Sequence, residues 1–397
     1  MSEILDFYKN KKVLVTGHTG FKGSWLCRIL INAGAQVLGY SLEPPTDPNL
    51  FSLAGIEDKI EHVIGDIRDL RKLSDVFDRF QPEIVLHLAA QPIVRESYKN
   101  PVGTYETNVM GTVNICECVR THECVRSFLN VTTDKVYKNN EWAWGYRENE
   151  PLDGYDPYSN SKSCSELVTH SYINSFYDIE RVRVSTARAG NVIGGGDFAV
   201  DRIIPDCVRA AAQNRKNKSL ETYSESTKAP GAVRDNIESI GSTDSSTTDA
   251  ICDNSTDTLD VGSIIVRNPY STRPYQHVLE PLFAYLMIAM KQYEDKSCAG
   301  FYNVGPDEKD CVTTGDLVTI FCSKWGEGLS WIDRYDGGPH EANFLKLDCS
   351  LLKSTFGWKP KWGIEEAIQK TIEWSKVYMD GGDIEAEMNR EITEYLQ

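Results

Sequence analysis

The sequence contains no apolar run that approaches the length of a membrane span, and it is short of positive charge. Lys and Arg number 42 against 58 Asp and Glu, which gives a formal net charge of -16 at pH 7. Because nucleic acids and anionic membranes are bound through basic surfaces, this balance argues against both as partners. The opening residues M-S-E-I-L-D-F-Y-K-N show no basic and apolar signal pattern, so we expect a cytoplasmic protein.

The sequence also lacks any C-x-x-C pair, although it has 11 cysteines. Cys116 and Cys118 are too close together for a zinc knuckle and lie in a helical pattern. We therefore expect reduced thiols and no metal site. A length of 397 residues allows one large or two ordinary domains with an ample core.

The most informative stretch is Lys11 to Cys27, K-K-V-L-V-T-G-H-T-G-F-K-G-S-W-L-C. A short apolar run predicts a buried strand, and apolar residues at helical spacing follow three glycines. Gly17 permits a tight turn, Gly20 lets a pyrophosphate approach the backbone, and Gly23 lets the helix pack closely on the strand. Free amides at the helix start, together with Lys22, would face an anionic ligand. Tight strand-to-helix turns use glycines for other reasons too, but the order of strand, turn and helix favours a dinucleotide site.

Further strands are predicted to alternate with helices, which indicates a parallel sheet. The strands are expected at residues 36–42, 59–64, 83–88, 127–132, 182–187, 264–267 and 301–305, and a long helix at about 102–120. The fold class is therefore α/β, a doubly wound parallel (Rossmann) sheet with a smaller mixed C-terminal domain. We place the dinucleotide-binding domain at residues 1–190, with a returning segment near 264–290, and the substrate domain at 191–397.

Residues 214–262 differ sharply in composition from the rest of the chain. They are rich in Ser, Thr, Asp and Asn and poor in apolar residues. Such a segment buries too little surface to offset its ordering entropy, so we predict a disordered insertion without a role in chemistry.

The end of the second predicted strand favours NAD over NADP. Glu43 follows this strand and could bind a ribose, and no Arg adjoins it to hold a 2′-phosphate. Asp66 could bind the adenine amino group, although Asp66 or Asp69 could equally cap the next helix. Small residues in H-L-A-A, 87–90, leave room for a cofactor, and His87 itself is expected to be packed and hydrogen-bonded. The candidate cofactor-binding residues are Gly17, Thr19, Gly20, Phe21, Lys22, Gly23, Asp66, Ile67, Leu88, Ala89, Ala90, Tyr158 and Lys162.

Two short motifs carry the candidate chemistry. Tyr158 and Lys162 are four residues apart at a helix start and so lie on one helical face. A lysine ammonium and a nicotinamide ring would both favour the phenolate, so that Tyr158 could take a hydroxyl proton as a hydride leaves the same carbon. Thr133, Asp134 and Lys135 end the fifth strand, where open parallel sheets bind ligands. Alternatively, Asp134 caps a turn and Lys135 is solvated.

These motifs resemble the extended short-chain dehydrogenase/reductase family, in its nucleotide-sugar dehydratase branch. The resemblance covers nearly all of the chain except 214–262. It rests on A-A-Q-P-I-V-R-E-S-Y (89–98), D-K-V-Y-K-N (134–139), R-A-G-N-V-I-G-G-G-D (188–197), R-I-I-P-D (202–206), R-N-P-Y-S-T-R-P-Y-Q-H-V (267–278), G-W-K-P (357–360) and P-H-E-A-N (339–343).

The resemblance implies dehydration of CDP-glucose to CDP-4-keto-6-deoxyglucose on tightly held NAD, for deoxysugar and surface polysaccharide synthesis such as a lipopolysaccharide O-antigen. Tyr158 would deprotonate the sugar 4-hydroxyl, which Thr133 orients, and Asp134 would protonate the leaving 6-hydroxyl. Lys135 stands where similar dTDP-glucose enzymes have a glutamate base, which leaves open whether it takes the carbon-5 proton or stabilises the enolate. The candidates for binding the substrate are Asn191, Arg202 and Arg273, with Arg95 and His277 weaker, and a homodimer or higher homo-oligomer is implied.

Four other functions remain open from the residues. A different nucleotide-sugar 4,6-dehydratase, or a 4-epimerase, would share Tyr158 and Lys162. A non-catalytic NAD-sensing module would not need both of these residues, and an interaction protein would depend on 214–262.

Overall fold

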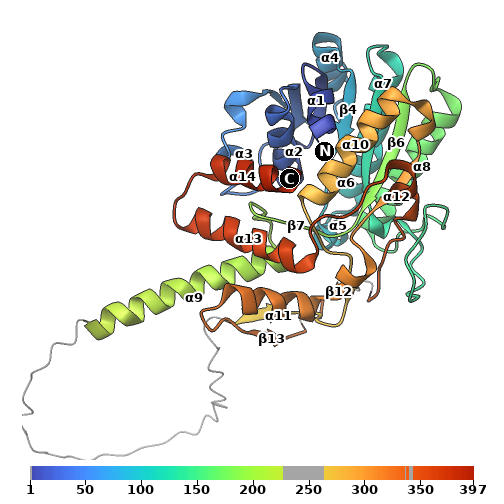
Figure 1. The fold of residues 1–397 in the computed structure, drawn as a ribbon. Helices are drawn as coiled ribbons and strands as arrows, with labels where there is room; N and C mark the ends of the chain where they lie inside the picture. Colours follow the sequence, from blue (N-terminus) through green and yellow to red (C-terminus); the bar gives the residue numbers. More distant parts are fainter. Residues whose placement is uncertain (1, 227–262, 336, 339–342) are drawn as a thin grey trace, which may run out of the picture.

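The computed structural model describes residues 2–226, 263–335, 337–338 and 343–397 (Figure 1). Its centre is a seven-stranded sheet in the order β11-β6-β5-β4-β1-β2-β3. Every pairing in this sheet is parallel, which confirms the predicted doubly wound α/β fold. The strands are β1 (Lys12–Thr16), β2 (Gln36–Ser41), β3 (Glu61–Ile64), β4 (Ile84–His87), β5 (Ser127–Thr133), β6 (Arg183–Ala189) and β11 (Phe301–Val304).

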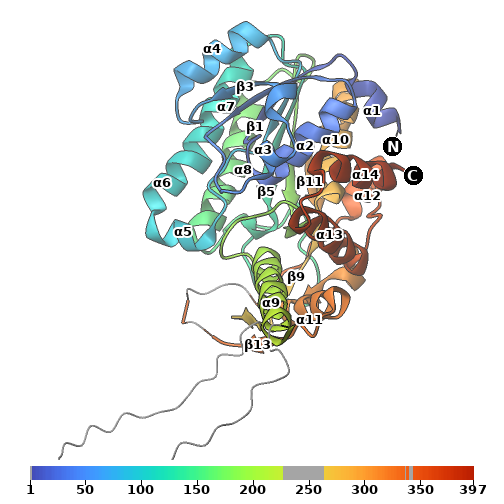
Figure 2. The same ribbon diagram turned by 90° about the vertical axis from the view of Figure 1, so that its left-hand side faces the viewer.

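Helices cover both faces of the sheet (Figure 2). One layer consists of α1 (Ser2–Tyr8), α2 (Phe21–Asn32) and α10 (Leu279–Glu294), and the other of α4 (Leu70–Phe80), α7 (Gly111–Thr121) and α8 (Pro157–Ser175). Alternate residues of β1 supply the two cores: Val13 and Val15 pack in the α2 and α10 layer, and Leu14 packs in the α4 and α7 layer. Burial on both faces is why the three central residues of this strand are all apolar.

The predicted helix over 102–120 is interrupted. Here α6 (Pro101–Tyr105) passes through a π-helical turn, Glu106–Met110, into α7. Asn108, in the π turn, donates to the Ser161 hydroxyl at 2.9 Å, and Thr112 shares a 2.8 Å hydrogen bond with Ser165. These hydrogen bonds join the π turn and α7 to α8. Thr107, also in the π turn, lines a cavity described below.

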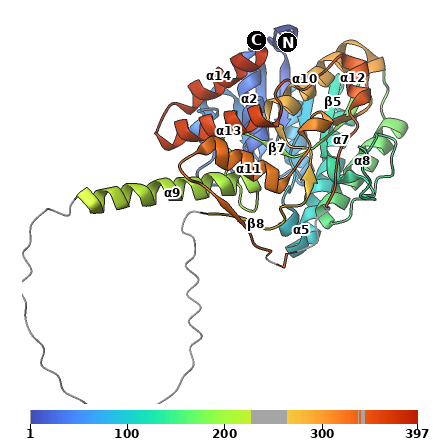
Figure 3. The ribbon, with the colours of Figure 1, turned by 60° about the horizontal axis from the view of Figure 1, so that its bottom comes forward.

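A second lobe lies beyond the carboxyl ends of the strands (Figures 1 and 3). Its core combines residues of α9 (Ile203–Ser226), α11 (Thr314–Trp325) and α13 (Ile364–Met379). Short paired strands complete it: β7 (Val192–Ile193) with β10 (Gln276–His277), β9 (Thr272–Arg273) with β12 (Val312–Thr313), and β8 (Ile264–Val266) with β13 (Trp331–Asp333). The remaining helices are α3 (Leu50–Leu53), α5 (Val94–Lys99), α12 (Ser350–Phe356) and α14 (Ile384–Leu396).

Two predicted boundaries differ from the structure. The segment that returns to the main sheet is α10 with β11, whereas β8 pairs with β13 in the second lobe. Helix α9 continues to Ser226, into the segment predicted to be disordered. Its Ala, Gln, Arg and Lys residues favour a helix despite their polarity, and Arg215 pairs with Asp380 at 2.9 Å. Residues 227–262 and 339–342, which include most of P-H-E-A-N, lie outside the described residues.

None of the described helices is long and apolar enough to cross a membrane. Within the same residues, no group of three or more His, Cys, Asp or Glu side chains is placed to hold a metal ion.

Candidate active site

The first cavity, here called the switch-point cavity, has a volume of about 510 Å³. It lies beyond the carboxyl ends of the neighbouring strands β1 and β4. Strand β1 continues through β2 to one edge of the sheet, and β4 continues through β5 to the other. Open parallel sheets bind ligands at this position, outside the carboxyl ends of the strands. All thirteen candidate cofactor-binding residues line this cavity.

The glycine turn is shaped by close backbone contacts. Gly17 has a φ of +77°, and a Cβ added to it would lie 2.7 Å from the Ala89 nitrogen. A Cβ at Gly23 would lie 2.1 Å from the Gly17 oxygen, so α2 could not pack here with a larger residue. A Cβ added to Gly20 would have only one neighbour within 4 Å, the Gly17 oxygen at 3.5 Å, so Gly20 faces open space. The contacts of Gly17 and Gly23 fit the tight turn and the close helix packing that the spacing predicted, and the role of Gly20 toward a pyrophosphate stays a prediction.

The predicted adenosine end of the cavity contains an arginine that sequence reasoning missed. Arg68 lines the cavity together with Glu43, although it follows β3 and not β2. Its guanidinium pairs with Asp66 at 2.6 Å and with Glu106 at 3.0 Å, and the pair with Arg68 lowers the pKa of Asp66. Two carboxylates thus neutralise this arginine. Asp69 caps α4 by accepting from the Lys72 amide at 3.0 Å, as the alternative reading proposed.

His87 is packed and hydrogen-bonded, as expected. Its Nδ1 lies 2.7 Å from the Thr16 hydroxyl, and burial lowers its pKa to about 3. This imidazole is therefore neutral at physiological pH.

Strand β5 and helix α8 bring the two chemical motifs together. Asp156 caps α8 by accepting from the Ser159 amide at 3.0 Å, and Pro157 begins the first turn. Tyr158 and Lys162 therefore lie one turn apart and line the switch-point cavity together. Thr133 ends β5, and Asp134 begins the short turn that follows it. The fold thus places the phenol and the carboxylate at one site.

Burial controls the electrostatics of this site. The Lys162 Nζ donates to the Val131 carbonyl at 3.1 Å, and burial, assisted by the charge of Lys22, lowers the pKa of Lys162 to about 7. Burial raises the pKa of Tyr158 to about 12, although the Thr133 hydroxyl and Arg202 lower it. In the ligand-free site Tyr158 is therefore a phenol, and added positive charge is needed to make it a base.

Asp134 is the buried acid of the site. It is 1% exposed, and burial raises its pKa. Its Oδ1 accepts from the Thr133 hydroxyl at 2.8 Å, whereas its Oδ2 is buried without a hydrogen-bond partner. A carboxyl group in this environment favours the protonated form, which is the form that a general acid needs.

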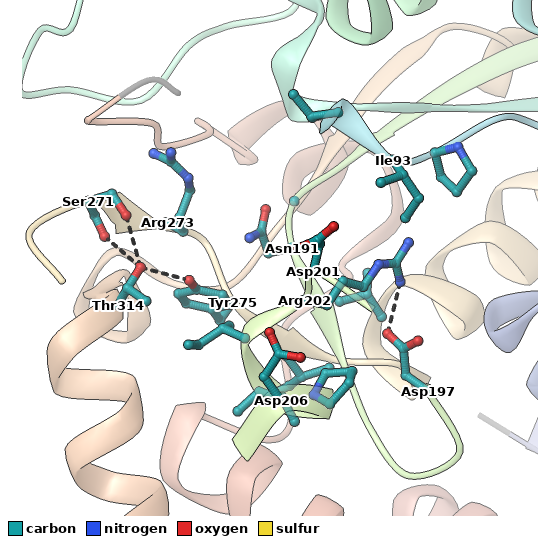
Figure 4. Close-up of a pocket in the computed structure, with 18 of the residues that line it drawn as sticks. Ile93, Asn191, Asp197, Asp201, Arg202, Asp206, Ser271, Arg273, Tyr275 and Thr314 are labelled. Atoms are coloured by element: carbon teal, nitrogen blue, oxygen red, sulfur yellow. Dashed lines mark hydrogen bonds and ion pairs between the residues drawn. The ribbon is translucent and has the colours of Figure 1, made fainter. Parts of the chain in front are cut away.

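The second cavity, here called the interlobe cavity, has a volume of about 530 Å³ and extends from Asp134 and Lys135 into the second lobe. Figure 4 shows part of its lining, including Asn191, Arg202 and Arg273. Four of the five candidate substrate-binding residues line it: Arg95, Asn191, Arg202 and Arg273. Arg202 is held by Asp197 at 2.8 Å, and Arg273 is 3% exposed. Arginine side chains at these positions are suited to the oxygens of a phosphate group.

His277, the fifth candidate, lies elsewhere. It lines neither cavity, and its fully buried ring packs 4.9 Å from the ring of Trp362. Its Nε2 lies 3.4 Å from the Glu391 carboxylate of α14. The resemblance offered His277 as a weaker candidate beside Arg273, but the two residues belong to different short strands, β10 and β9. The structure therefore provides no support for His277 as a pyrophosphate ligand.

A cluster of three hydroxyls also lines the interlobe cavity, and sequence reasoning missed it (Figure 4). The Thr314 hydroxyl lies 2.9 Å from that of Ser271 and 3.1 Å from that of Tyr275. Ser271 and Tyr275 belong to a stretch that was recognised as a whole, but Thr314 lies on α11 and carried no signal. Such hydroxyls can donate to the oxygens of a polar ligand.

The two cavities share part of their lining. Tyr158, Lys22 and Arg202 face both, and so do Phe21, Pro92, Ile93, Thr132 and Asp197. Ligands in the two cavities would therefore meet at the Tyr158 hydroxyl, with Asp134 beside it. This geometry suits hydride transfer between two bound molecules, coupled to proton transfer by side chains.

The chain is similar to known proteins in sequence and in fold. A family model described as GDP-mannose 4,6 dehydratase matches residues 14–268. CDP-glucose 4,6-dehydratase of Salmonella typhimurium (strain LT2) is 42% identical over 397 residues, which cover 98% of each chain. A dTDP-D-glucose 4,6-dehydratase of Dictyostelium discoideum is 30% identical over 220 residues, 52% of this chain and 49% of that one.

Solved structures share the fold at lower identity. A dTDP-glucose 4,6-dehydratase from Bacillus anthracis in complex with NAD gives a TM-score of 0.68 at 19% identity, covering 94% of this chain and 98% of that one. A UDP-glucose 4-epimerase from Stenotrophomonas maltophila gives a TM-score of 0.70 at 19% identity, covering 94% and 100%.

Proposed function

The chain belongs to the GDP-mannose 4,6-dehydratase family of extended short-chain dehydrogenase/reductases, and on this premise we propose that it dehydrates CDP-glucose to CDP-4-keto-6-deoxyglucose. One observation carries the reaction type: the buried carboxyl of Asp134 lies beside Tyr158 where the two cavities meet. A dehydratase needs both a base for the 4-hydroxyl and an acid for the 6-hydroxyl. The substrate follows from the full-length relative that is 42% identical.

The residues of the switch-point cavity fit NAD. The backbone around Gly17 and Gly23 is too close for any side chain, and Gly20 faces open space at the start of α2. This arrangement is suited to a pyrophosphate at a helix N-terminus. Glu43 would bind the ribose hydroxyls, and Asp66 the adenine amino group. When bound, the nicotinamide would take a hydride from carbon 4 of the sugar and later return it to carbon 6.

Tyr158 acts as the base in the first step of the proposed reaction. Its hydroxyl takes the proton of the sugar 4-hydroxyl, while Thr133 orients the substrate oxygen. Lys162 lies one helical turn away, and its ammonium favours the phenolate over the phenol. Burial lowers the pKa of Lys162 to about 7, so in the ligand-free site this charge is lost as pH rises through 7. Because burial raises the pKa of Tyr158, this residue keeps its proton in the ligand-free enzyme until positive charge enters the site.

Asp134 acts as the acid in the elimination step. The 4-keto group acidifies the proton on carbon 5, and Asp134 protonates the 6-hydroxyl as it leaves as water. Its free Oδ2 is the atom available to the substrate, since Oδ1 already accepts from Thr133. Lys135 lines the same cavity and either accepts the carbon-5 proton or stabilises the enolate.

The interlobe cavity would hold the nucleotide-sugar. Arg202 and Arg273 provide charge for the pyrophosphate, and Asn191 lies near them (Figure 4). Arg95, on α5, supplies a further cation from the opposite lobe. Removing Arg273 should raise the KM for the nucleotide-sugar more than it lowers kcat, because the pyrophosphate does not change in the reaction. Removing Arg202 should lower kcat as well, since Arg202 also lowers the pKa of Tyr158.

We also propose that the enzyme is a cytoplasmic homodimer whose product enters deoxysugar and surface polysaccharide synthesis. Exposed apolar side chains near α6 and on α8 support self-association: Val102 is 67% exposed and Leu167 is 51% exposed. The Tyr105 hydroxyl bonds Asn160 at 2.9 Å and ties these two helices together. Light scattering of the purified protein tests the state, and Val102→Glu with Leu167→Glu should give a monomer.

Mass analysis of the product tests the proposed function. The enzyme with NAD is offered CDP-glucose and, in parallel, UDP-, dTDP- and GDP-activated hexoses. The expected result is loss of one water from CDP-glucose and a product that absorbs in alkali, which a 4-keto-6-deoxy sugar does. A product of unchanged mass would indicate the 4-epimerase, and dehydration of another nucleotide-sugar alone would contradict CDP-glucose as the substrate.

A further inference from the structure

Lys22 occupies an unusual place for a residue of a glycine turn. It is the second residue of α2, directly after the turn, and its side chain lines both cavities together with Tyr158. Among the residues that the structure describes, its ammonium makes neither a hydrogen bond nor an ion pair. A partly buried ammonium without an acceptor needs an anion or a polar ligand beside it.

Asp134, in the interlobe cavity with Lys22, has an acceptor oxygen that lacks a donor. Its Oδ2 is buried and accepts no hydrogen bond. Burial and the charge of Arg202 lower the pKa of Lys22 to about 8, and the carboxylate of Asp134 opposes this lowering. The charges of Lys22 and Asp134 therefore interact. Lys135 and Arg273 also favour the anion of Asp134 and line the interlobe cavity with it, whereas Lys22 lines both cavities.

We propose that Lys22 is a positioning residue for Asp134, whose ammonium stabilises the carboxylate that Asp134 becomes when it protonates the departing 6-hydroxyl. This inference rests on the proposed dehydratase function. It gives Lys22 a role in the elimination, besides any contact it makes with the cofactor.

The charge balance of the elimination explains why such a cation speeds the reaction. The carbon–oxygen bond at carbon 6 breaks, its electron pair leaves with the oxygen, and the proton of Asp134 completes the water molecule. The electron pair of the carbon–hydrogen bond at carbon 5 forms the new double bond, and that proton passes to the base. Lys22 exchanges no proton. Its attraction to Asp134 grows as the negative charge develops, so it lowers the barrier more than it stabilises the ground state.

The first hydride transfer involves Tyr158 and not Asp134, so the two steps respond differently to loss of Lys22. Lys22→Met removes the charge and keeps the length of the side chain, whereas Lys22→Arg keeps a charge. Each holoenzyme is mixed rapidly with CDP-glucose, and absorbance of the reduced nicotinamide is followed together with the mass of the product. Because Lys22 also lies beside Lys162 and Tyr158, we compare the two steps within the variant: Lys22→Met should slow the loss of water about tenfold or more beyond any slowing of nicotinamide reduction. Reduced cofactor then accumulates, and Lys22→Arg restores most of the dehydration rate.

A double-mutant cycle tests whether Lys22 acts through Asp134. In the Asp134→Asn background no carboxylate forms, so Lys22→Met should cause no further loss of dehydration. Equal effects in both backgrounds would overturn the proposal. So would loss of bound NAD from Lys22→Met, which would make Lys22 a cofactor ligand only, or an equal slowing of both steps. If the wild-type enzyme fails to dehydrate CDP-glucose, the proposed function is wrong and this inference is wrong with it. If the wild-type enzyme turns over normally but Lys22→Met accumulates no reduced cofactor, only the role of Lys22 is overturned.

Discussion

Replacing Tyr158 by Phe removes one oxygen from the place where the two cavities meet. The ring, which lines both cavities, is retained, and the Thr133 hydroxyl keeps its bond to Asp134 at 2.8 Å. The variant should therefore fold and bind both ligands. What it loses is the group that accepts the proton of the 4-hydroxyl.

The magnitude follows from the role of a general base. Such a group contributes about 10²- to 10⁴-fold to a rate, which corresponds to about 3 to 5 kcal/mol of transition-state stabilisation. In the ligand-free site the pKa of Tyr158 is about 12, so near pH 8 only about one molecule in 10⁴ carries the phenolate. Bound positive charge must lower this pKa before the base can work. Because the phenolate forms as pH rises, the wild-type rate should increase with pH and approach a plateau above the pKa of the complex.

The assay is reduction of enzyme-bound nicotinamide in a single turnover with CDP-glucose, measured across a range of pH. Tyr158→Phe should be at least about 10²-fold slower than wild type and should show no rise with pH. Retention of NAD by the variant, measured after denaturation, controls for binding. A variant within a few-fold of wild type, or one with the same pH dependence, would refute the assignment of Tyr158 as the base.

Three further predictions concern other charged groups of the site and core. Lys162→Met should abolish turnover yet raise the Tm of the ligand-free protein. Burial lowers the pKa of Lys162 from 10.5 to about 7, so this lysine destabilises the folded state fully below pH 7 and progressively less as pH rises toward 10.5. The gain in Tm should therefore shrink over that range. A gain independent of pH would contradict this account. Lys135→Glu should retain oxidation at carbon 4 and slow dehydration, as judged by accumulated reduced cofactor, and an equal loss of both steps would make Lys135 structural. Glu166→Gln should lower the free energy of unfolding by about 3 to 5 kcal/mol in urea, because Arg188, 3.0 Å from Glu166 and 1% exposed, would keep a buried charge, whereas Glu117→Gln on the surface should change little.

Much of the cofactor site could be predicted because its geometry is local. The strand, the glycine turn and the first turn of α2 are consecutive. At Gly17 and Gly23 neighbouring backbone atoms lie too close to allow a side chain. The pair Tyr158 and Lys162 depends only on the helical repeat. Residue order along alternating strands and helices was enough to place Thr133 and Asp134 at the same edge of the sheet as the glycine turn.

Predictions that depended on composition were less accurate. Helix α9 continues into the segment predicted to be disordered, because helix propensity and an ion pair to Asp380 act where polarity alone suggested disorder. The helix over 102–120 contains a π turn, which no periodicity indicated. Arg68 enters the switch-point cavity from the loop after β3, although the residues around β2 indicated no arginine.

The sequence by itself determined the local elements: the parallel α/β order, the dinucleotide turn, and the helical spacing that places a phenol above an ammonium. These follow from backbone sterics and side-chain periodicity, which act over a few residues. The tertiary structure alone decided which distant side chains share a cavity. It brought Lys22, Asp134 and Arg202 to one junction and buried His277 against Glu391, because long-range packing sets the direction in which each side chain points.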